Sequence, residues 1–554
     1  MLFSTRDKEY LSSICNGNTW DFVPATIKFA SLGLTASRKG EKKDPKPVLL
    51  CKMACLHKGQ DSPPGHPTPE NPVPSTEWLT YIFHRQEILK IGVKVKSVTR
   101  ECDSLQGGIS QGIFACGVVY EEDGKHHQLS KNECQSAGLP LSVVFKASPG
   151  SINLKQGREA EYFNDESEMR QALACLCANK SATAFPTPKI FASLREWGGN
   201  PQGIYILMED IRRVGVRADQ FHGAQGGTQK IKKGEGSQTS SDSELKSEEM
   251  WRLSFEYAAK THARFMGRIV KEKKFNTMAL GEDEGLLKGI QRLKYADWLM
   301  GSNKQGFEKS IKDCMTMWQL CETSWMDQRL AKLIQASIET TNFEKAVTKM
   351  RSRPLTLVHG DFHAKNLFYM KKGAEKVLAL DFSEIGVGDP FSDLLQYTLS
   401  DVSIETRRKH EQDVLKAYWK RLTAVMQSTS SSSSSKTKLT TEGVGEGKSA
   451  QISSLVSQLT FERVVELYKS GLDRWLYFLP MMAFFDGCTK QAKAKAEKEK
   501  KGSWSPPSRT VYFHDAIKAF VEDHCKDTDY FVLRGACEVN LEAFLNRNQK
   551  QAPS

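Results

Sequence analysis

The sequence lacks the long apolar run that a transmembrane helix needs, which is roughly 20 residues. Its richest apolar run, residues 475–485, contains Pro480 and ends at Asp486. The first ten residues have neither the basic start nor the continuous apolar stretch of a signal peptide. We therefore expect no export signal, no membrane span and a cytoplasmic location.

The cysteine pattern lacks the features of a disulfide framework or a zinc site. The 13 cysteines are odd in number and scattered over a chain of 554 residues, which is typical of reduced thiols. Cys51 and Cys55, and likewise Cys175 and Cys177, are not followed by a second Cys or His pair at a zinc-like interval. No structural zinc site is predicted.

Nucleic-acid binding is not expected either, although the formal net charge is +12. Much of the positive charge comes from local runs at 38–46 and 490–501, and such runs are typical of solvated surface or linkers. The sequence has no zinc finger, ribonucleoprotein motif or aromatic-basic stripe.

Composition divides the chain into two patterned parts and several connecting segments. Residues 1–75 are poorly patterned and end in a Pro-rich stretch, so we expect an N-terminal extension with a Pro-rich linker. Residues 212–250 and the Ser-rich 427–450 are predicted to be disordered insertions, because they bury too little apolar surface to offset the entropy of ordering. The patterned parts are 76–211 and 251–540, and 541–554 is a C-terminal tail.

The first patterned part predicts a small antiparallel sheet with one helix. A helix capped by Ser75 or Thr76 should open it, and strands are expected at 93–99, 112–120, 141–147 and 203–208. The one helix that accompanies the sheet of this lobe is expected after the third strand, over 156–179. The second part is mainly helical, as in 251–265, 413–425 and 516–524. The predicted fold class is therefore α+β with two lobes.

Three polar residues at the ends of short strands carry the strongest chemical signal. Asp361 and Asn366 have the D-x-x-x-x-N spacing of a phosphoryl-transfer catalytic loop, and Asp381 follows the next strand. Asp361 is the candidate acceptor of a substrate hydroxyl's proton, while Asn366 and Asp381 offer oxygen ligands to Mg2+. Asp and Asn also favour turns for local reasons, so the ordered coincidence of strands, spacing and carboxylates carries the argument.

These stretches identify a family by resemblance. His359-Gly-Asp-Phe-His-Ala-Lys-Asn366 and Leu380-Asp-Phe-Ser383, followed by Gly388-Asp-Pro-Phe-Ser-Asp-Leu-Leu395, resemble the aminoglycoside phosphotransferase and choline kinase group, and most closely its ecdysteroid-kinase-like (CHK) branch. The resemblance covers roughly residues 76 to 540. It implies a two-lobed protein-kinase-like fold and transfer of the γ-phosphate of ATP to a hydroxyl group of a small molecule.

The resemblance also implies roles for small-lobe residues. Lys146, after the apolar run 143–145, matches the lysine that contacts the α- and β-phosphates. Its helix partner is expected to be Glu159, with Glu161 or Glu168 as alternatives. We expect His359 to order the catalytic loop, and Asp393 to brace the large lobe by accepting loop hydrogen bonds.

Two further segments complete the predicted nucleotide site. The glycines Gly107, Gly108 and Gly112 precede a strand and could let backbone N–H groups approach phosphate, although an ordinary hairpin turn has the same composition. The segment from Met208 through Glu209 to Ile211 resembles the hinge between the lobes, whose backbone would hydrogen-bond adenine.

The sequence departs from the protein-kinase pattern in ways that favour small substrates. Gly360 stands where protein kinases have the arginine of H-R-D, and no A-P-E element follows Asp381. The expected function is an ATP- and Mg2+-dependent small-molecule kinase whose acceptor is a sterol, choline-like or sugar-like alcohol. The competing interpretation is a pseudokinase or nucleotide-binding scaffold without chemistry. No oligomeric state is predicted.

Overall fold

The computed structural model separates the chain into two compact units, which we describe one at a time. The sheet unit comprises Met1–Gly215 and Leu378–Ser383, and the helical unit comprises Val216–Val377 and Glu384–Ser554. The structure describes residues 20–26, 51–57, 65–68, 70–101, 113–122, 127–148, 186–195, 204–212, 214–217, 247–266, 301, 303–370, 376–382, 384–432, 454–499 and 504–524.

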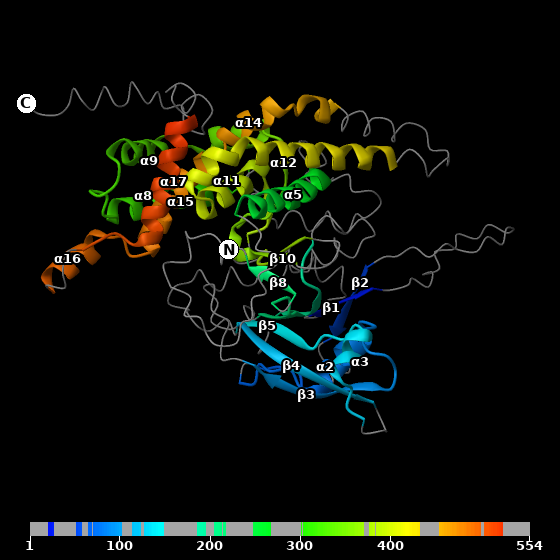
Figure 1. Cartoon of the computed structure of the whole chain (residues 1–554). Helices are drawn as coiled ribbons and strands as arrows, with labels where there is room; N and C mark the ends of the chain where they lie inside the picture. The colour runs from blue at the N-terminus through cyan, green and yellow to red at the C-terminus, as the bar shows by residue number, and fades with distance from the viewer. Residues whose placement is uncertain are drawn as a thin grey trace, which may run out of the picture. The chain divides into compact units, whose positions relative to one another are not determined.

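The sheet unit is built on seven strands, and every neighbouring pair is antiparallel (Figure 1). The order is β2-β1-β6-β7-β5-β4-β3, so strands adjacent in the sequence are only partly adjacent in the sheet. The strand bounds are β1 Trp20–Thr26, β2 Cys51–His57, β3 Val93–Arg100, β4 Ile113–Glu122, β5 Ser142–Ser148, β6 Ile190–Arg195 and β7 Ile204–Glu209.

Helix α2 (Thr76–Arg85) begins at the predicted cap, because the Ser75 hydroxyl accepts a hydrogen bond from the Trp78 N–H at 3.1 Å. Its apolar stripe is fully buried against the sheet and includes Trp78 and Phe83. The Trp78 ring meets Tyr205 of β7 edge-on, and Tyr205 stacks on Phe145 of β5. Each such side chain contributes about 1.5–3 kcal/mol by leaving water. A short helix, α3 (Lys131–Ser136), follows a capping box of Ser130 and Glu133.

The helical unit has ten α-helices among its described residues. They are α5 Ser247–Phe265, α8 Lys304–Leu320, α9 Gln328–Thr340, α10 Phe343–Ser352, α11 Pro390–Asp401, α12 Ile404–Ser432, α14 Phe461–Lys469, α15 Asp473–Phe485, α16 Lys490–Lys498 and α17 Ser508–His524. Helix α12 packs along α5, where Phe255 meets Tyr418 at 6.2 Å between ring centroids (Figure 1). The fully buried helix α11 lies in this core.

Short strands in the helical unit carry the segment of greatest interest. Strand β9 (Thr356–Val358) pairs antiparallel with β12 (Gly386–Gly388). A loop and the short 3-10 helix η5 (Ala364–Asn366) then lead into β10 (Leu367–Met370). The Met370 N–H at the end of β10 donates to the Lys376 carbonyl at 2.8 Å. Strands β8 (Gly215–Arg217) and β11 (Val377–Ala379) span the boundary between the units.

The observed elements confirm the predicted α+β, two-lobed fold class. The expected strands of the small lobe are β3, β4, β5 and β7, and the expected large-lobe helices are α5, α12 and α17. The helix predicted over 156–179 lies outside the described residues. In the part of the chain that the structure describes, no helix is both long enough and apolar enough to span a membrane.

The structure differs from the sequence prediction at three segment boundaries. Residues 1–75 contain β1 and β2, which join the sheet, whereas we expected only an extension there. Proline has no N–H to donate, and Pro24 lies opposite Met53 of β2, whereas the pairing of β1 with β6 involves only Asp21 and Phe22. Helix α12 continues through 427–432, the start of the expected Ser-rich insertion, and α5 begins at Ser247 inside the 212–250 segment.

Candidate active site

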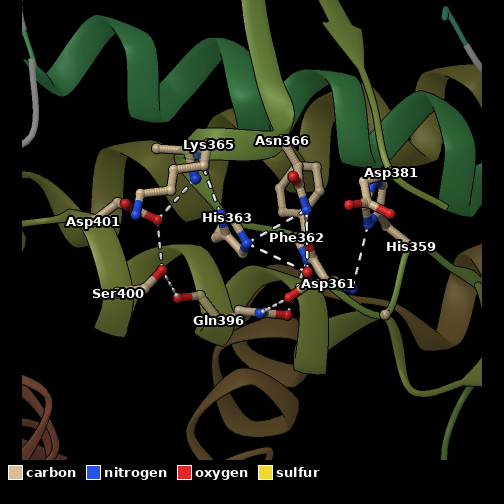
Figure 2. Close-up of polar contacts among 12 residues, drawn as sticks. His359, Asp361, Phe362, His363, Lys365, Asn366, Asp381, Gln396, Ser400 and Asp401 are labelled. Atoms are coloured by element: carbon tan, nitrogen blue, oxygen red, sulfur yellow. Dashed lines mark hydrogen bonds and ion pairs between the residues drawn. The ribbon is translucent and has the colours of Figure 1, made fainter. Parts of the chain in front are cut away.

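The structure brings Asp361 and Asn366 together, as their spacing predicts. The Asn366 Nδ2 group donates to the Asp361 carbonyl at 2.9 Å and to Asp361 Oδ2 at 3.2 Å (Figure 2). Because Nδ2 makes these bonds, they fix the orientation of the amide and do not use its Oδ1 atom. The 3-10 turn η5 produces this contact by folding Asn366 back over the loop.

The Asp361 carboxylate is held by two more side chains. Gln396 Nε2 donates to Oδ1 at 2.7 Å, and His363 Nε2 lies 3.3 Å from Oδ2 (Figure 2). Burial raises the pKa of Asp361, but His363, His359 and Gln396 favour the charged form and together hold the pKa well below its usual range. The side chain remains 31% exposed. It is therefore an ionised hydrogen-bond acceptor that a solute can reach.

The hydrogen bonds of His363 indicate its tautomer. Its Nδ1 atom accepts from the Lys365 backbone N–H at 3.2 Å, so Nδ1 carries no proton. A neutral imidazole then has its proton on Nε2, the atom that faces Asp361. The sequence left the role of His363 open, and the structure places it against the Asp361 carboxylate.

Asp393 anchors the start of the loop 359–366, as predicted. Its Oδ2 accepts from the His359 N–H at 2.7 Å and its Oδ1 accepts from the Gly360 N–H at 2.9 Å. His262 of α5 lies 3.3 Å from the same carboxylate, and both side chains are 1% exposed. Burial raises the pKa of Asp393, but its bonds to His262 and the loop hold the pKa below the usual range.

The backbone at position 360, where protein kinases have an arginine, leaves room only for glycine. Its φ angle is +81°, in the left-handed region that favours glycine, and a Cβ atom there would lie 1.9 Å from the Glu384 carbonyl oxygen. Any side chain at this position would force the catalytic loop away from that backbone.

In the sheet unit, the structure pairs Lys146 with Asp381. Lys146 Nζ on β5 lies 3.8 Å from Asp381 Oδ1, and the lysine side chain is 6% exposed. The segment that carries Asp381 is tied to this unit, because the Ala379 N–H donates to the Pro186 carbonyl at 3.0 Å and Leu380 packs on the cluster around Val144. Asp381 has φ +56°, a left-handed conformation that is uncommon outside glycine and that recurs at functional sites.

Of the predicted hinge residues, Met208 and Glu209 end β7 and Ile211 follows it, and part of their backbone is already paired. The Glu209 N–H donates to the Lys189 carbonyl at 2.8 Å, and the Ile211 carbonyl accepts from Gly215 at 2.8 Å. Met208 and Ile211 are buried. Burial raises the pKa of the neighbouring Asp210, but hydrogen bonds from Arg212 and Ser142 outweigh it and lower the pKa. The turn after β7 is therefore held by several hydrogen bonds. One of the groups already bonded is the Glu209 N–H.

Several predicted site residues lie outside the described part of the chain. They are Gly107, Gly108 and Gly112 of the glycine cluster, and Glu159 with its alternatives Glu161 and Glu168. Gln396 was not predicted at all. Its only sequence signal is a position three residues after Asp393, which places both side chains on one face of α11.

The donor set suits magnesium better than a transition metal. Within the described residues, no group of three or more His, Cys, Asp or Glu side chains is arranged to hold a metal ion. Magnesium needs only one or two protein oxygen ligands, because water and substrate phosphates supply the rest. Asn366 in the helical unit offers an amide oxygen and Asp381 in the sheet unit offers a carboxylate, and each by itself is a ligand of this kind.

Sequence comparison confirms the family resemblance for part of the chain. Residues 236–430, less than half of the chain, match the sequence model of the ecdysteroid kinase-like family. The matched stretch contains the segments of Asp361, Asn366 and Asp381. No curated protein sequence matches the chain.

Comparison of structures finds kinases at low similarity. Choline kinase LicA from Streptococcus pneumoniae, in its AMP complex, is 12% identical with a TM-score of 0.35, and the match covers 80% of this chain and 97% of LicA. The GDP complex of wild-type aminoglycoside 2'-phosphotransferase-IIIa is 11% identical with a TM-score of 0.32, covering 81% of this chain and 98% of that one. A choline/ethanolamine kinase family protein from Mesorhizobium loti is 11% identical with a TM-score of 0.32, covering 81% and 92%. Values this low are no evidence for an activity.

Proposed function

We propose that the protein is an ATP-dependent small-molecule kinase that transfers the γ-phosphate to a hydroxyl group of a small alcohol. The observation that carries the proposal is the arrangement around Asp361, an accessible ionised carboxylate held by Asn366, His363 and Gln396. The ecdysteroid kinase-like match over the same loop supports it.

Asp361 would orient the acceptor hydroxyl and take its proton. Because its pKa lies below the usual range, Asp361 is a weak base and stays ionised near neutral pH. A weak base suits a phosphoryl transfer whose transition state is loose, since the hydroxyl becomes strongly acidic only as its oxygen bonds to phosphorus. The His363 Nε2 proton would stabilise the carboxylate before the transfer.

Lys146 would bind the phosphates of ATP. A buried ammonium group attracts a polyanion strongly because water screens it little, and Lys146 is 5% exposed. In the described structure the Asp381 carboxylate lies at this ammonium group. We propose Asn366 and Asp381 as the ligands of Mg2+, which when bound would neutralise charge on the phosphates. The backbone of Met208, Glu209 and Ile211 is proposed to contact adenine.

The acceptor is proposed only as a class, a hydroxyl compound of the sterol, choline-like or sugar-like kind. A magnesium-dependent thermal shift with ATP, followed by ATP consumption against pools of such alcohols, tests the proposal. Asp361→Ala should abolish ATP-dependent phosphorylation, and Asp381→Ala should abolish binding of magnesium–ATP. Turnover retained in both variants would defeat the assignment, and nucleotide binding without turnover by the unmodified chain would favour a pseudokinase.

A further inference from the structure

The side chain of Gln396 is committed at both ends to the catalytic loop. Its Oε1 atom accepts from the Phe362 N–H at 2.9 Å, and its Nε2 group donates to Asp361 Oδ1 at 2.7 Å (Figure 2). The residue is 3% exposed, so water does not compete freely for either bond. A primary amide is the side chain that offers an acceptor and a donor in this arrangement, since a carboxylate only accepts at neutral pH.

Gln396 belongs to a series of side chains on α11 that hold successive backbone N–H groups of the loop. Asp393 accepts from His359 and Gly360, and one turn later Gln396 accepts from Phe362. Two turns after Asp393, Asp401 Oδ2 accepts from the Ala364 N–H at 2.9 Å. The helix therefore holds four backbone N–H groups of the loop, those of residues 359, 360, 362 and 364. Of the three α11 side chains, only Gln396 also reaches the carboxylate of Asp361.

Ser400 lies between Gln396 and Asp401 and contacts both of them. Its hydroxyl lies 2.6 Å from the Gln396 carbonyl and 2.5 Å from Asp401 Oδ2 (Figure 2). The Gln396 side chain therefore projects from a braced and fully buried stretch of helix, which leaves its amide little freedom to turn away from Asp361.

We propose that Gln396 is a positioning residue for Asp361: it fixes the direction of the carboxylate by donating a hydrogen bond to Oδ1 while the Phe362 N–H holds its other end. The proposal rests on the proposed function, in which Asp361 orients the acceptor hydroxyl. The proposal adds Gln396, a residue of α11, to the groups that hold Asp361. It predicts that replacing the Nε2 donor by a hydrogen-bond acceptor disturbs the Asp361 carboxylate.

A double-mutant cycle that exchanges the amide and the carboxylate tests the contact itself. Gln396→Glu puts two carboxylates within hydrogen-bond distance, so the melting temperature at pH 7 should fall by roughly 3–8 °C. In Gln396→Glu combined with Asp361→Asn the donor and acceptor are reversed, and most of the loss should disappear. Gln335→Glu is the matched control, because the exposed Gln335 amide donates to a carboxylate, that of Glu339, at 2.8 Å.

Separate measurement of kcat and KM tests positioning as opposed to a structural role. In Gln396→Glu the kcat per folded molecule for magnesium–ATP, with water as acceptor, should fall by about tenfold or more while the KM for magnesium–ATP stays within about twofold, because the substitution misdirects Asp361 and leaves nucleotide binding alone. Gln396→Met removes the donor without adding charge, and it should lower kcat by about tenfold with the KM likewise unchanged.

The outcomes separate this inference from the proposed function. A cycle without coupling between positions 396 and 361 overturns the inference, whether or not turnover is found. A coupled cycle in a chain that turns over no ATP contradicts the proposed function, and Gln396 is then a structural anchor only. A coupled cycle with an unchanged kcat in Gln396→Glu and Gln396→Met also overturns the positioning role.

Discussion

Lys146 Nζ and Asp381 Oδ1 lie 3.8 Å apart in the sheet unit, although the two residues are far apart in the sequence. The lysine side chain is 6% exposed and the aspartate side chain 35% exposed. A contact at this distance is an ion pair without an ideal hydrogen bond. We interpret this ion pair as one that a bound nucleotide would break. Phosphate oxygens would then replace the Asp381 carboxylate at the Lys146 ammonium group.

Lys146→Met should weaken ATP binding by tenfold or more, because it removes the buried cation and keeps most of the apolar length of the side chain. Isothermal titration with magnesium–ATP measures the change. Lys94→Met is the matched control, since Lys94 also lies on a strand of this sheet but its side chain is 43% exposed and faces Glu121. Equal affinities of the two variants would remove Lys146 from the proposed nucleotide site.

Asp393→Asn should destabilise the protein by about 2–4 kcal/mol. The substitution keeps the shape of the side chain but removes the charge that accepts from His359 and Gly360 and faces His262. Urea unfolding measures the loss, and the exposed Asp413 of α12 provides a control as Asp413→Asn. A difference of less than about 0.5 kcal/mol between the two variants would show that the buried network does not depend on the charge.

Gly360→Ala should be more damaging than a positive φ angle alone explains. A non-glycine residue in the left-handed region costs roughly 1–2 kcal/mol, and at Gly360 the new Cβ would also meet the Glu384 carbonyl at 1.9 Å. Gly92→Ala isolates the first effect, because Gly92 has φ +85° and no atom within 4 Å of its Cβ position.

The loss of stability in each glycine variant is measured as the shift of its denaturation midpoint. We expect Gly360→Ala to lose at least twice as much stability as Gly92→Ala and to lower ATP turnover as well, since the clash lies next to Asp361. Equal losses of stability would mean that the backbone at Glu384 moves away from the new Cβ atom at no cost in free energy.

The stability contribution of Asp361 should depend on pH in a defined direction. Its pKa is lower in the folded chain than the usual value near 4, so its contribution is present above that value and is lost as the pH falls through the folded pKa. The melting temperature of the unmodified chain minus that of Asp361→Asn should therefore shrink as the pH falls from 6 to 3. A difference that grows on acidification would mean that folding raises the pKa of Asp361.

The sequence predicted the local geometry of the catalytic loop because the constraint is itself local. Asp361 and Asn366 are five residues apart, and one 3-10 turn followed by a strand is enough to join their side chains. Asp393 could be expected to hold the loop because the family pattern includes it. Four of the seven strands of the sheet, β3, β4, β5 and β7, were predictable from β-branched and aromatic runs such as 143–145.

Contacts between distant segments were not predictable in the same way. Gln396 has no distinctive spacing, and only the packing of α11 against the loop shows that its amide reaches Asp361. Strands β1 and β2 contain Pro24 and two cysteines, which are weak strand signals, and they are recognised only by their pairing in the sheet. The pairing of Lys146 with Asp381 likewise depends on how 378–383 lies on the sheet unit.

The central claim is that Asp361 performs the chemistry of a small-molecule kinase, and transfer of labelled phosphate tests it most directly. The unmodified chain, Asp361→Asn and the control Asp413→Asn are incubated with magnesium and ATP labelled with 18O in the γ-phosphate, together with a pool of alcohols. Mass spectrometry then follows the labelled phosphate. We predict labelled phosphomonoesters from the unmodified chain and from Asp413→Asn, and a loss of about 100-fold or more in Asp361→Asn with ATP binding retained. Transfer by Asp361→Asn at the unmodified rate would contradict the account.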